Sequence, residues 1–359
     1  MLRSGSYALI LAGGRGTRFW PRSRIRSAKQ VLRLFGARTL IQQTADRLRP
    51  VFPPERIWIL TNDHLRGEIV RQLPEVPRRQ ILAEPAQRNT APAIGLAAHL
   101  LAARDPSAVM AVFPADHIIG RPAPFLKLVR AALRSAAEGK MAVLGIQPRW
   151  PETGYGYLEF PGRLQPGRLE PAPVHRFREK PDLETAERYL AGGNHFWNAG
   201  MFFWSARVFL DALRRYLPRT ASLLASLPPP ESRGFASALR QTYPLCENIS
   251  VDYAVLEKAP GVVGFAAGDI GWNDVGSWNA VYELHRRDAD GNVALADAIF
   301  HGSRGNYVDV RDRFVALVGV DGLVVVDTPD ALLIAARARA QEVGAVVKAL
   351  EKRKRDELL

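Results

Sequence analysis

The chain has 359 residues, of which 47% are hydrophobic and 24% are charged. This balance excludes a disordered chain, and the length is enough for one large core and a smaller accessory unit. No apolar run approaches the roughly 20 residues that a membrane-spanning helix needs, and the first one, Tyr7 to Ala12, runs into glycines rather than a cleavage site. The sequence therefore predicts neither a membrane protein nor a signal peptide.

The net charge of +13 arises from 49 basic and 36 acidic residues. Most of the arginines are scattered along the chain, and only Lys352 to Arg355 form a run, so the charge does not predict a nucleic-acid partner. The positive charge would equally suit the binding of a small anionic substrate. The single cysteine, Cys246, excludes an internal disulfide and a thiolate metal cage, which favours a reducing compartment and hence the cytoplasm.

The first half of the chain alternates short apolar runs with helical patterns, as in a parallel sheet that is covered by helices. The predicted strands are Tyr7 to Ala12, Arg56 to Thr61, Gln80 to Ala83, Val109 to Pro114 and Met141 to Ile146. The helices predicted between them are Thr39 to Arg49, His64 to Leu73, Ala91 to Ala103 and Pro124 to Glu138. This order predicts a doubly wound α/β sheet that binds its ligands beyond the carboxyl ends of the strands.

The pattern changes twice in the second half. From Gly154 to about Trp204 it is rich in β-type segments with a short helix near Leu183 to Leu190, which suggests an insertion that builds one wall of a pocket. From about Asn292 onward short strand-like runs lie between turns, and a polar helix follows; the runs are Asn306 to Val310, Val315 to Val318, Leu323 to Asp327 and Ala331 to Ile334. The sequence thus predicts a large domain over 1–290 and a small β domain over 291–359, whose exposed edges make it a candidate for dimerisation.

A glycine-rich segment, LAGGRGTRFW from Leu11 to Trp20, follows the first predicted strand directly. Its glycines allow backbone N–H groups to approach a phosphate closely, and Arg15 and Arg18 add positive charge. The spacing fits neither the dinucleotide fingerprint, since Phe19 replaces the third glycine, nor the Walker pattern. The segment therefore indicates a phosphate loop of another kind.

Three charged residues further along the chain are candidates for the same site. Lys29 lies close enough in sequence to fold back over the glycine loop, although a lone lysine is more often a surface residue. Asp116 follows a predicted strand and Asp274 sits in a glycine-flanked turn, GWNDVG. Two such carboxylates suit Mg²⁺, which takes few protein ligands and completes its shell with phosphate and water, whereas the alternative is that Asp116 caps a helix or turn.

Nine segments occur in an order that resembles the mannose-1-phosphate guanylyltransferases, also called GDP-mannose pyrophosphorylases. They are LAGGRGTRFW, AKQ, RNTAPAIGLAA, FPADH, TGYGYLEF, FREKPD, FWNAGMFFW, SVDYAVLEK and GWNDVGSW, and they cover about residues 6 to 285. The resemblance implies a Rossmann-like nucleotide-diphospho-sugar transferase fold, with a mixed, mostly parallel sheet and a small C-terminal β-helix-like domain.

The resemblance also implies a role for each matching residue. Those that would bind the nucleotide are Leu11, Ala12, Gly13, Gly14, Arg15, Gly16, Thr17, Arg18, Glu84, Pro85, Arg88, Asn89, Thr90 and Asp116. Arg15 and Lys29 would neutralise charge during transfer, and Asp116 and Asp274 would hold Mg²⁺. The sugar phosphate would be bound by Gly154, Glu179, Lys180 and Asn198, with Lys180 on the phosphate and therefore also catalytic.

Each of these roles has a simpler competitor. Lys180 could be a surface residue, Asn198 could stabilise a turn, and His117 is interpreted as a structural histidine rather than a base. The sequence departs from the family pattern at Ala28, where a proline is usual, and at Ala199, where serine is frequent. Neither change removes a charged group, but both weaken a prediction of the sugar.

The resemblance implies a Mg²⁺-dependent reaction in which GTP and mannose 1-phosphate give GDP-mannose and diphosphate. Two alternatives stay open on the sequence. One is a related enzyme with another base or sugar, such as a thymidylyl- or uridylyltransferase for glucose 1-phosphate. The other is a non-catalytic scaffold of the same fold, which would be expected to lose the metal carboxylates or the loop arginine.

Overall fold

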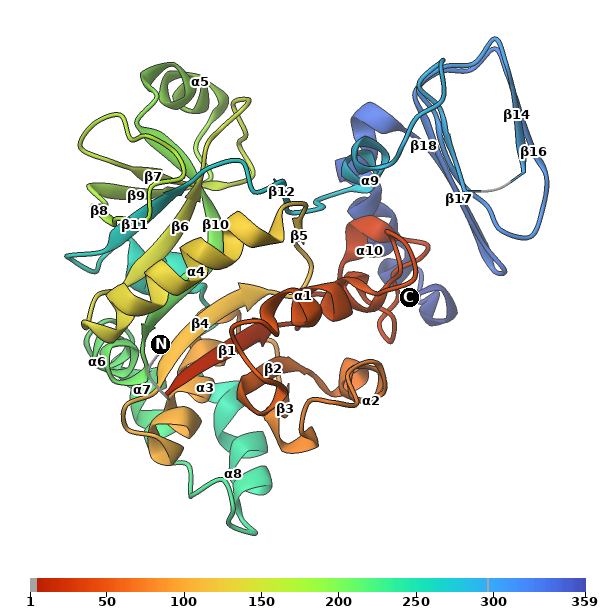
Figure 1. Cartoon of the computed structure of the whole chain (residues 1–359). Coiled ribbons are helices and arrows are strands. Elements are labelled where there is room, and N and C mark those ends of the chain that lie inside the picture. The colour runs from red at the N-terminus through yellow and green to blue at the C-terminus, as the bar shows by residue number, and fades with distance from the viewer. Residues whose placement is uncertain (1–4, 296) are drawn as a thin grey trace.

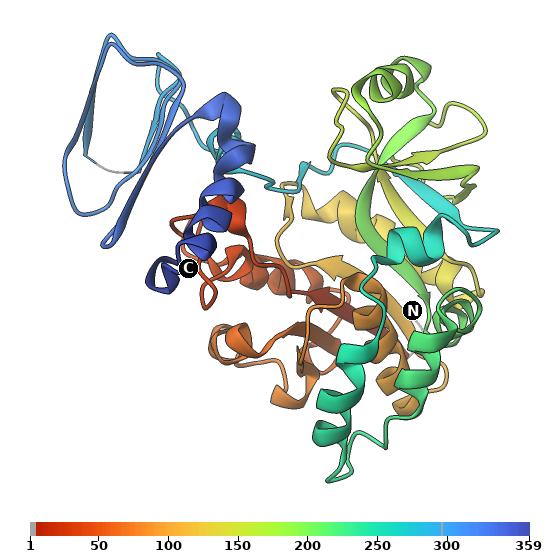
Figure 2. The same cartoon turned by 180° about the vertical axis from the view of Figure 1, so that it is seen from behind.

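The computed structural model describes residues 5–295 and 297–359 and shows a large α/β unit joined to a small β unit (Figure 1). The small unit projects from one end of the large one, and its last helix, α10 (Gly344–Lys352), returns to the N-terminal loops. The view from behind shows the same arrangement, with α10 beside the first segments of the chain (Figure 2). The C-terminal helix and the N-terminal loops therefore meet at one region of the molecule.

The large unit is built on a mixed sheet whose first four strands are parallel. Its strands in spatial order are β3 (Ile81–Glu84), β2 (Ile57–Asn62), β1 (Ser6–Leu11), β4 (Val109–Pro114), β10 (His195–Ser205), β6 (Ala142–Ile146), β11 (Val263–Ala267) and β8 (Ala172–Pro173). Strand β10 pairs antiparallel with β4 on one side and β6 on the other, while β6 and β11 are parallel. All five strands predicted in the first half occur within one residue of their predicted bounds.

The sheet has a hydrophobic core on each face, because successive side chains along its strands point to alternate faces. In β1, Ala8 and Ile10 pack on one face and Tyr7 and Leu9 on the other, because successive side chains of a strand point to opposite faces. Both faces are covered, which is why these strands are apolar throughout and show no alternation in the sequence.

Helices cover both faces of this sheet (Figure 1). Their bounds are α1 (Leu40–Leu48), α2 (Asp63–Gln72), α3 (Thr90–Arg104), α4 (Pro122–Ala137), α5 (Leu183–Gly192), α6 (Ala206–Tyr216), α7 (Pro218–Ala225), α8 (Phe235–Thr242) and α9 (Trp278–Leu284). Residues of α1 and α4 belong to one core, and those of α3 and α6 to the other. Thr39 and Gln42 begin α1 with a capping box, in which each side chain binds the other's backbone N–H.

The β-rich insertion predicted after Gly154 forms one side of the large unit. Strands β7 (Gly156–Glu159) and β9 (Arg176–Glu179) make an antiparallel pair that joins the sheet through β10. The short strands β5 (Ile118–Ile119) and β12 (Trp272–Asn273) pair with each other, so the segments after β4 and β11 lie together. This pairing brings two distant parts of the sequence to the same edge of the sheet.

The C-terminal unit is built of short strands that pair in parallel, except for its last two, which are antiparallel. Its bounds are β13 (Val293–Ala294), β14 (Ala298–His301), β15 (Tyr307–Asp309), β16 (Val315–Val318), β17 (Leu323–Thr328) and β18 (Ala331–Ala336). Buried asparagines stabilise its turns: Asn306 Nδ2 donates to Asn292 Oδ1 at 3.0 Å and to the Val320 carbonyl at 3.0 Å. Within the described residues, no helix has the length and apolar character that a bilayer crossing requires.

Candidate active site

The glycine loop begins where β1 ends, at the carboxyl edge of the sheet. Gln30, which is buried, donates from Nε2 to the carbonyl oxygens of Ala12 at 2.7 Å and Gly14 at 3.0 Å, and so fixes the loop from beneath. Gly16 has φ of 62°, and a Cβ there would lie 2.6 Å from Cβ of Lys29. Only glycine meets both conditions, so the loop and Lys29 pack directly against each other.

Lys29 links the Asp116 carboxylate to the backbone of Asp274. Its Nζ donates to Asp116 Oδ2 at 2.8 Å and to the backbone carbonyl of Asp274 at 2.7 Å, and only 6% of the residue is exposed. Burial by itself would raise the pKa of Asp116, but the Lys29 ammonium and His117 lower it below its ordinary value. Asp116 is therefore an anion in this site, and the lysine holds the loop after β4 against the turn after β12.

The turn that carries Asp274 has a strained backbone. Val275 is buried with φ of 48°, and its N–H donates to Asn273 Oδ1 at 2.7 Å, which stabilises the tight turn. The Tyr155 hydroxyl donates to Asp274 Oδ1 at 2.6 Å. Burial and the Asp274 charge raise the pKa of Tyr155, so the hydroxyl stays protonated and acts as a donor.

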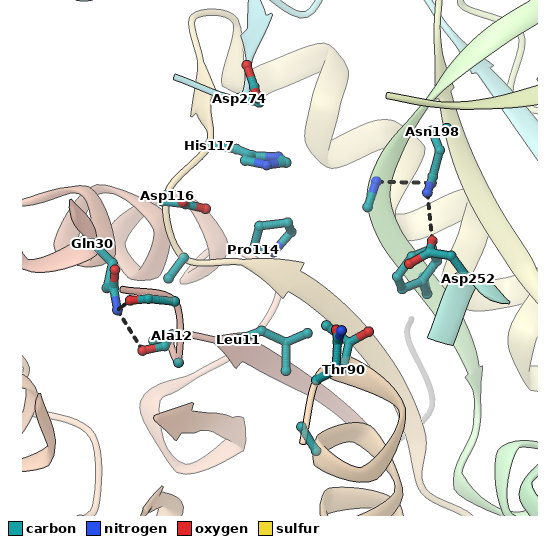
Figure 3. Close-up of a pocket in the computed structure, with 18 of the residues that line it drawn as sticks. Leu11, Ala12, Gln30, Thr90, Pro114, Asp116, His117, Asn198, Asp252 and Asp274 are labelled. Atoms are coloured by element: carbon teal, nitrogen blue, oxygen red, sulfur yellow. Dashed lines mark hydrogen bonds between the residues drawn. The ribbon is translucent and has the colours of Figure 1, made fainter. Parts of the chain in front are cut away.

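A cleft of about 640 Å³ opens above these residues and extends to the β-rich insertion. Figure 3 shows Asp116, His117 and Asp274 on one side of it and Asn198 with Asp252 on the other. The predicted site residues that line it are Leu11, Ala12, Gly13, Gly14, Arg15, Glu84, Arg88, Asn89, Thr90, Asp116, Gly154, Glu179, Asn198 and Asp274. Among the described residues, the other predicted ones lie outside its lining: Gly16, Thr17, Arg18, Lys29, Pro85 and Lys180.

The Glu84 carboxylate, which is partly buried, lies next to the glycine loop at one end of the cleft. Glu84 ends β3, and its Oε2 accepts from the Tyr243 hydroxyl at 2.5 Å. A Cβ at Gly13 would lie 3.2 Å from Glu84 Oε1, which places this carboxylate against the loop. Burial raises the pKa of Glu84 to about 7, an effect that the Tyr243 hydrogen bond only partly offsets.

The first turn of α3 forms the adjoining wall. Asn89 has φ of 65° and its Oδ1 accepts from the Thr90 N–H at 2.9 Å, so it caps the helix. The Thr90 hydroxyl accepts from the Val251 N–H at 2.8 Å, and the Arg88 side chain donates to the Pro244 carbonyl. These bonds fix the α3 terminus to the segment that follows α8 and hold the cleft wall rigid.

The opposite end of the cleft contains two acidic side chains. Asn198 Nδ2 donates to Asp252 Oδ1 at 2.9 Å, and Asn198 Oδ1 accepts from the Gly200 N–H at 3.0 Å, which fixes the amide orientation. Lys180, with φ of 47°, donates from Nζ to Glu179 Oε1 at 2.6 Å. Burial and the nearby Glu179 charge raise the pKa of Asp252 to about 6.

Both arginines of the glycine loop contact the C-terminal unit. Arg15 Nη2 lies 2.6 Å from Glu351 Oε1, and Arg18 Nη1 donates to Gln341 Oε1 at 2.6 Å. The Arg15–Glu351 pair is exposed, with 42% and 39% of the two side chains accessible, so it is a weak ion pair. Arg15 still lines the cleft and is free to exchange this partner for an anionic ligand.

The cleft also contains polar residues that the sequence did not predict, among them Asp252 and Tyr155, while Tyr243 contacts the site through Glu84. Asp252 begins a π-helical turn over Asp252–Leu256, and only the fold brings it to Asn198. The segments SVDYAVLEK and TGYGYLEF contain Asp252 and Tyr155, so both lie within the motifs that carry the resemblance. Tyr243 lies outside every such motif, and no local signal identifies it.

Comparison with known proteins agrees with this geometry. Residues 7–291 match the nucleotidyl transferase family, and residues 298–350 match the MannoseP isomerase/GMP-like beta-helix domain. A mannose-1-phosphate guanylyltransferase of Klebsiella pneumoniae is 40% identical over 353 residues, which span 97% of this chain and 74% of that protein. One of Escherichia coli is 39% identical over 353 residues, with the same coverage of 97% and 74%.

A solved structure supports the same assignment. The crystal structure of a Thermus thermophilus protein, described as a mannose-1-phosphate geranyltransferase, is 33% identical and superposes with a TM-score of 0.84. The match covers 96% of this chain and 99% of that one. These relatives confirm the resemblance that the nine motifs indicated, and the predicted β-helix-like domain is confirmed by its own family match. The chain therefore belongs to the nucleotidyl transferase family.

Proposed function

We propose that this protein is a mannose-1-phosphate guanylyltransferase, which converts GTP and mannose 1-phosphate to GDP-mannose and diphosphate. The observation that carries the proposal is the contact of one buried lysine, Lys29, with both Asp116 and the Asp274 turn beside a glycine loop. The curated relatives that are about 40% identical over 97% of the chain have this activity in their names. No observation favours another base, another sugar or a scaffold role.

Nucleotidyltransferases of this kind generally use a divalent metal, and we propose Mg²⁺ held by Asp116 and Asp274. The hydrogen bonds to Lys29 and Tyr155 use one oxygen of each carboxylate, so the other oxygen of each can ligate a cation. In the described part of the chain, no group of three or more acidic, histidine or cysteine side chains is arranged so that it could hold a metal ion. Two carboxylates suit Mg²⁺, which usually keeps water and phosphate oxygens among its ligands. When bound, the ion would neutralise charge on the α-phosphate.

The nucleotide would occupy the end of the cleft formed by the glycine loop, Glu84 and α3. Backbone N–H groups from Gly13 to Thr17, with Arg18, would bind the triphosphate, and Leu11, Ala12, Pro85, Asn89 and Thr90 would surround the nucleoside. We propose that Glu84 reads guanine, because a carboxylate accepts from the N1–H and N2–H₂ donors on one edge of that base. Neither adenine nor the pyrimidines have this donor pair, so Glu84 would discriminate between nucleotides.

The sugar phosphate would occupy the opposite end. There the backbone at Gly154, the Glu179 carboxylate and the oriented amide of Asn198 offer donors and acceptors for ring hydroxyls. Lys180 is held by Glu179 through one N–H and has two more to offer a phosphate. We assign it to the phosphate of mannose 1-phosphate and count it among the catalytic residues.

The reaction needs no protein nucleophile, because the attacking phosphate oxygen is already an anion. That oxygen attacks the α-phosphorus of GTP in line, the bond to the bridging oxygen breaks, and diphosphate leaves with the negative charge. Lys29 uses two of its three N–H donors on protein oxygens, which leaves one for a phosphate oxygen. Arg15 would exchange Glu351 for the polyphosphate, so catalysis consists of positioning and charge neutralisation.

A diphosphate-release assay tests this proposal with four nucleoside triphosphates against mannose 1-phosphate and glucose 1-phosphate. We expect the highest kcat/KM for GTP with mannose 1-phosphate, and a loss of about 100-fold or more in kcat for Asp116→Asn and Asp274→Asn. Preference for another pair of substrates would identify a related enzyme of the family. Metal-dependent GTP binding without turnover would identify a scaffold.

We further propose that the C-terminal unit, residues 291–359, makes a homodimer, while residues 1–290 carry both substrates. Four large apolar side chains on its strands are exposed: Ile299 by 58%, Val318 by 65%, Leu332 by 53% and Ile334 by 61%. Leu332 and Ile334 lie on β18, which pairs with β17 on one side. Light scattering should give twice the chain mass, and Ile334→Glu should reduce it to one chain.

The partners that this proposal requires are two small anions and a cation. Neither nucleic acid nor a membrane is needed, and the basic residues of the cleft account for part of the net charge of +13. A single cysteine is consistent with a reducing compartment, and we place the enzyme in the cytoplasm.

A further inference from the structure

Tyr155 touches the metal side of the cleft while its neighbours form the sugar side. It precedes β7, and Gly154 and Gly156 on either side of it line the sugar end. Its hydroxyl crosses to Asp274, with Oη 2.6 Å from Oδ1. One side chain thus connects two walls of the cleft that are 119 residues apart in sequence.

The tyrosine ring is held in place by two tryptophans. It packs edge-to-face on Trp197 at a centroid distance of 5.3 Å and on Trp272 at 5.5 Å. Trp272 is two residues before Asp274, and its Nε1 donates to His117 Nδ1 at 3.2 Å. Edge-to-face pairs of this kind are favourable and directional, so the ring has little freedom to turn away from the carboxylate.

The backbone of Tyr155 is fixed as well. Its carbonyl oxygen accepts from the Lys180 N–H at 3.2 Å, which ties it to the strand that carries Glu179. Any shift of the sugar wall therefore moves the hydroxyl that holds Asp274.

We propose that Tyr155 is a positioning residue that fixes the Asp274 carboxylate for the divalent cation and couples its orientation to the sugar-binding wall. The proposal rests on the proposed function, since it takes Asp274 as a metal ligand. A carboxylate that ligates a metal through one oxygen rotates about its side-chain bonds unless the other oxygen is hydrogen-bonded. Loss of such an outer partner usually weakens metal binding by about 10- to 100-fold.

The test is the binding of Mn²⁺ to the whole protein in complex with GDP-mannose, followed by electron paramagnetic resonance of the free ion. Tyr155→Phe removes only the hydroxyl and keeps the ring between its tryptophans. We expect its Mn²⁺ dissociation constant to rise about tenfold. In the assay of diphosphate release, the Mg²⁺ concentration for half-maximal rate should rise by the same factor at saturating GTP and mannose 1-phosphate.

Tyr157→Phe is the matched control. Tyr157 lies two residues further along, on β7, and its hydroxyl is also hydrogen-bonded, to the Glu152 carbonyl at 2.8 Å and to Trp197 Nε1 at 3.0 Å, but neither bond involves Asp274. Its variant should bind Mn²⁺ as the wild type does. An equal loss of Mn²⁺ affinity in both variants would overturn the proposal, because the effect would then come from the strand as a whole.

A double-mutant cycle separates this inference from the proposed function. In an Asp274→Asn background, Tyr155→Phe should cause no further loss of Mn²⁺ affinity, and additive losses would refute the coupling. If Asp274→Asn alone binds Mn²⁺ with full affinity, the metal assignment itself is wrong. If Asp274→Asn is impaired while Tyr155→Phe matches the wild type, the metal site stands and the role of Tyr155 does not.

Discussion

The fold raises the pKa of the Glu84 carboxyl group into the physiological range. Burial beside the glycine loop raises its pKa to about 7, against 4.5 for an ordinary glutamate. Only the ionised form can accept from both donors on the guanine edge. The strength of nucleotide binding should therefore depend on pH, and the part of this dependence that is lost when Glu84 is replaced reports this residue.

GDP-mannose is the best ligand for measuring this dependence, since its diphosphate does not titrate near neutrality. Between pH 6 and pH 8 the ionised fraction of Glu84 rises from about one tenth to about nine tenths, so the dissociation constant should fall about tenfold. Calorimetric titration across this range measures the effect. In Glu84→Gln the slope should vanish, and a slope that persists in this variant would assign the titration to another group.

A rise in pH should strengthen nucleotide binding through Glu84 but lower the stability of the folded protein. Because the folded state holds the Glu84 proton more tightly than the unfolded state, raising the pH from about 4.5 to about 7 removes stability. In thermal unfolding, the melting temperature of Glu84→Gln should rise relative to that of the wild type as the pH rises through this window. A constant difference between the melting temperatures of the two proteins at every pH would contradict a raised pKa.

At the scale of elements, the glycine loop is the part of the site that tolerates substitution least. Gly16 has a left-handed backbone and almost touches Lys29, so Gly16→Ala adds conformational strain and a clash. A loss of about 2 kcal/mol or more in the free energy of unfolding is expected, measured by urea denaturation. Gly14→Ala is the control for stability, since nothing lies within 4 Å of its added Cβ. If both variants lose equal stability, the loop is not packed as described.

Element bounds in the first half could be predicted from the sequence because each strand is short, apolar and flanked by turns. The strand over Val109–Pro114 has the bounds that the sequence predicts. The antiparallel insertion of β10 between β4 and β6 could not be predicted, because a local pattern does not specify a strand's partner. The strand over Ala298–His301 was missed, since only one of its four residues, Ile299, is β-branched.

In the candidate site, too, the sequence predicted single residues but not the contacts between them. Asp116 and Asp274 could be predicted as a pair from their strand-end and turn positions, but their common contact with Lys29 depends on the pairing of β5 with β12. Asp252 could not be assigned a role, because it reaches the cleft only when its segment packs against β10. Spacing along the chain cannot report such contacts.

At the scale of the whole molecule, the C-terminal unit is bound to the segment that follows the glycine loop. Arg22 makes two hydrogen bonds to the Asp309 carboxylate, at 2.9 and 2.6 Å, and Arg24 pairs with Asp330 at 2.8 Å. Trp20 Nε1 donates to the Leu358 carbonyl at 2.9 Å. The two units therefore share one interface next to the glycine loop, which no sequence pattern indicated.

Burial distinguishes the two ion pairs in their contribution to stability. The side chain of Asp309 is 4% exposed, so Asp309→Asn leaves Arg22 without its charge partner and should cost about 3 kcal/mol. The side chain of Asp330 is 47% exposed, and Asp330→Asn should cost less than about 1 kcal/mol. Urea denaturation compares them, and an equal loss in both variants would show that this interface is not buried in solution.

The proposed mechanism depends most on a cation bound by both Asp116 and Asp274 at the mouth of the cleft. The most direct measurement is the anomalous diffraction of Mn²⁺ in crystals soaked with Mn²⁺ and GDP-mannose. We predict one strong peak within ligation distance of an oxygen from each aspartate and beside the diphosphate, and its loss in Asp274→Asn. A peak elsewhere in the cleft, with neither carboxylate as a ligand, would contradict the proposed metal site.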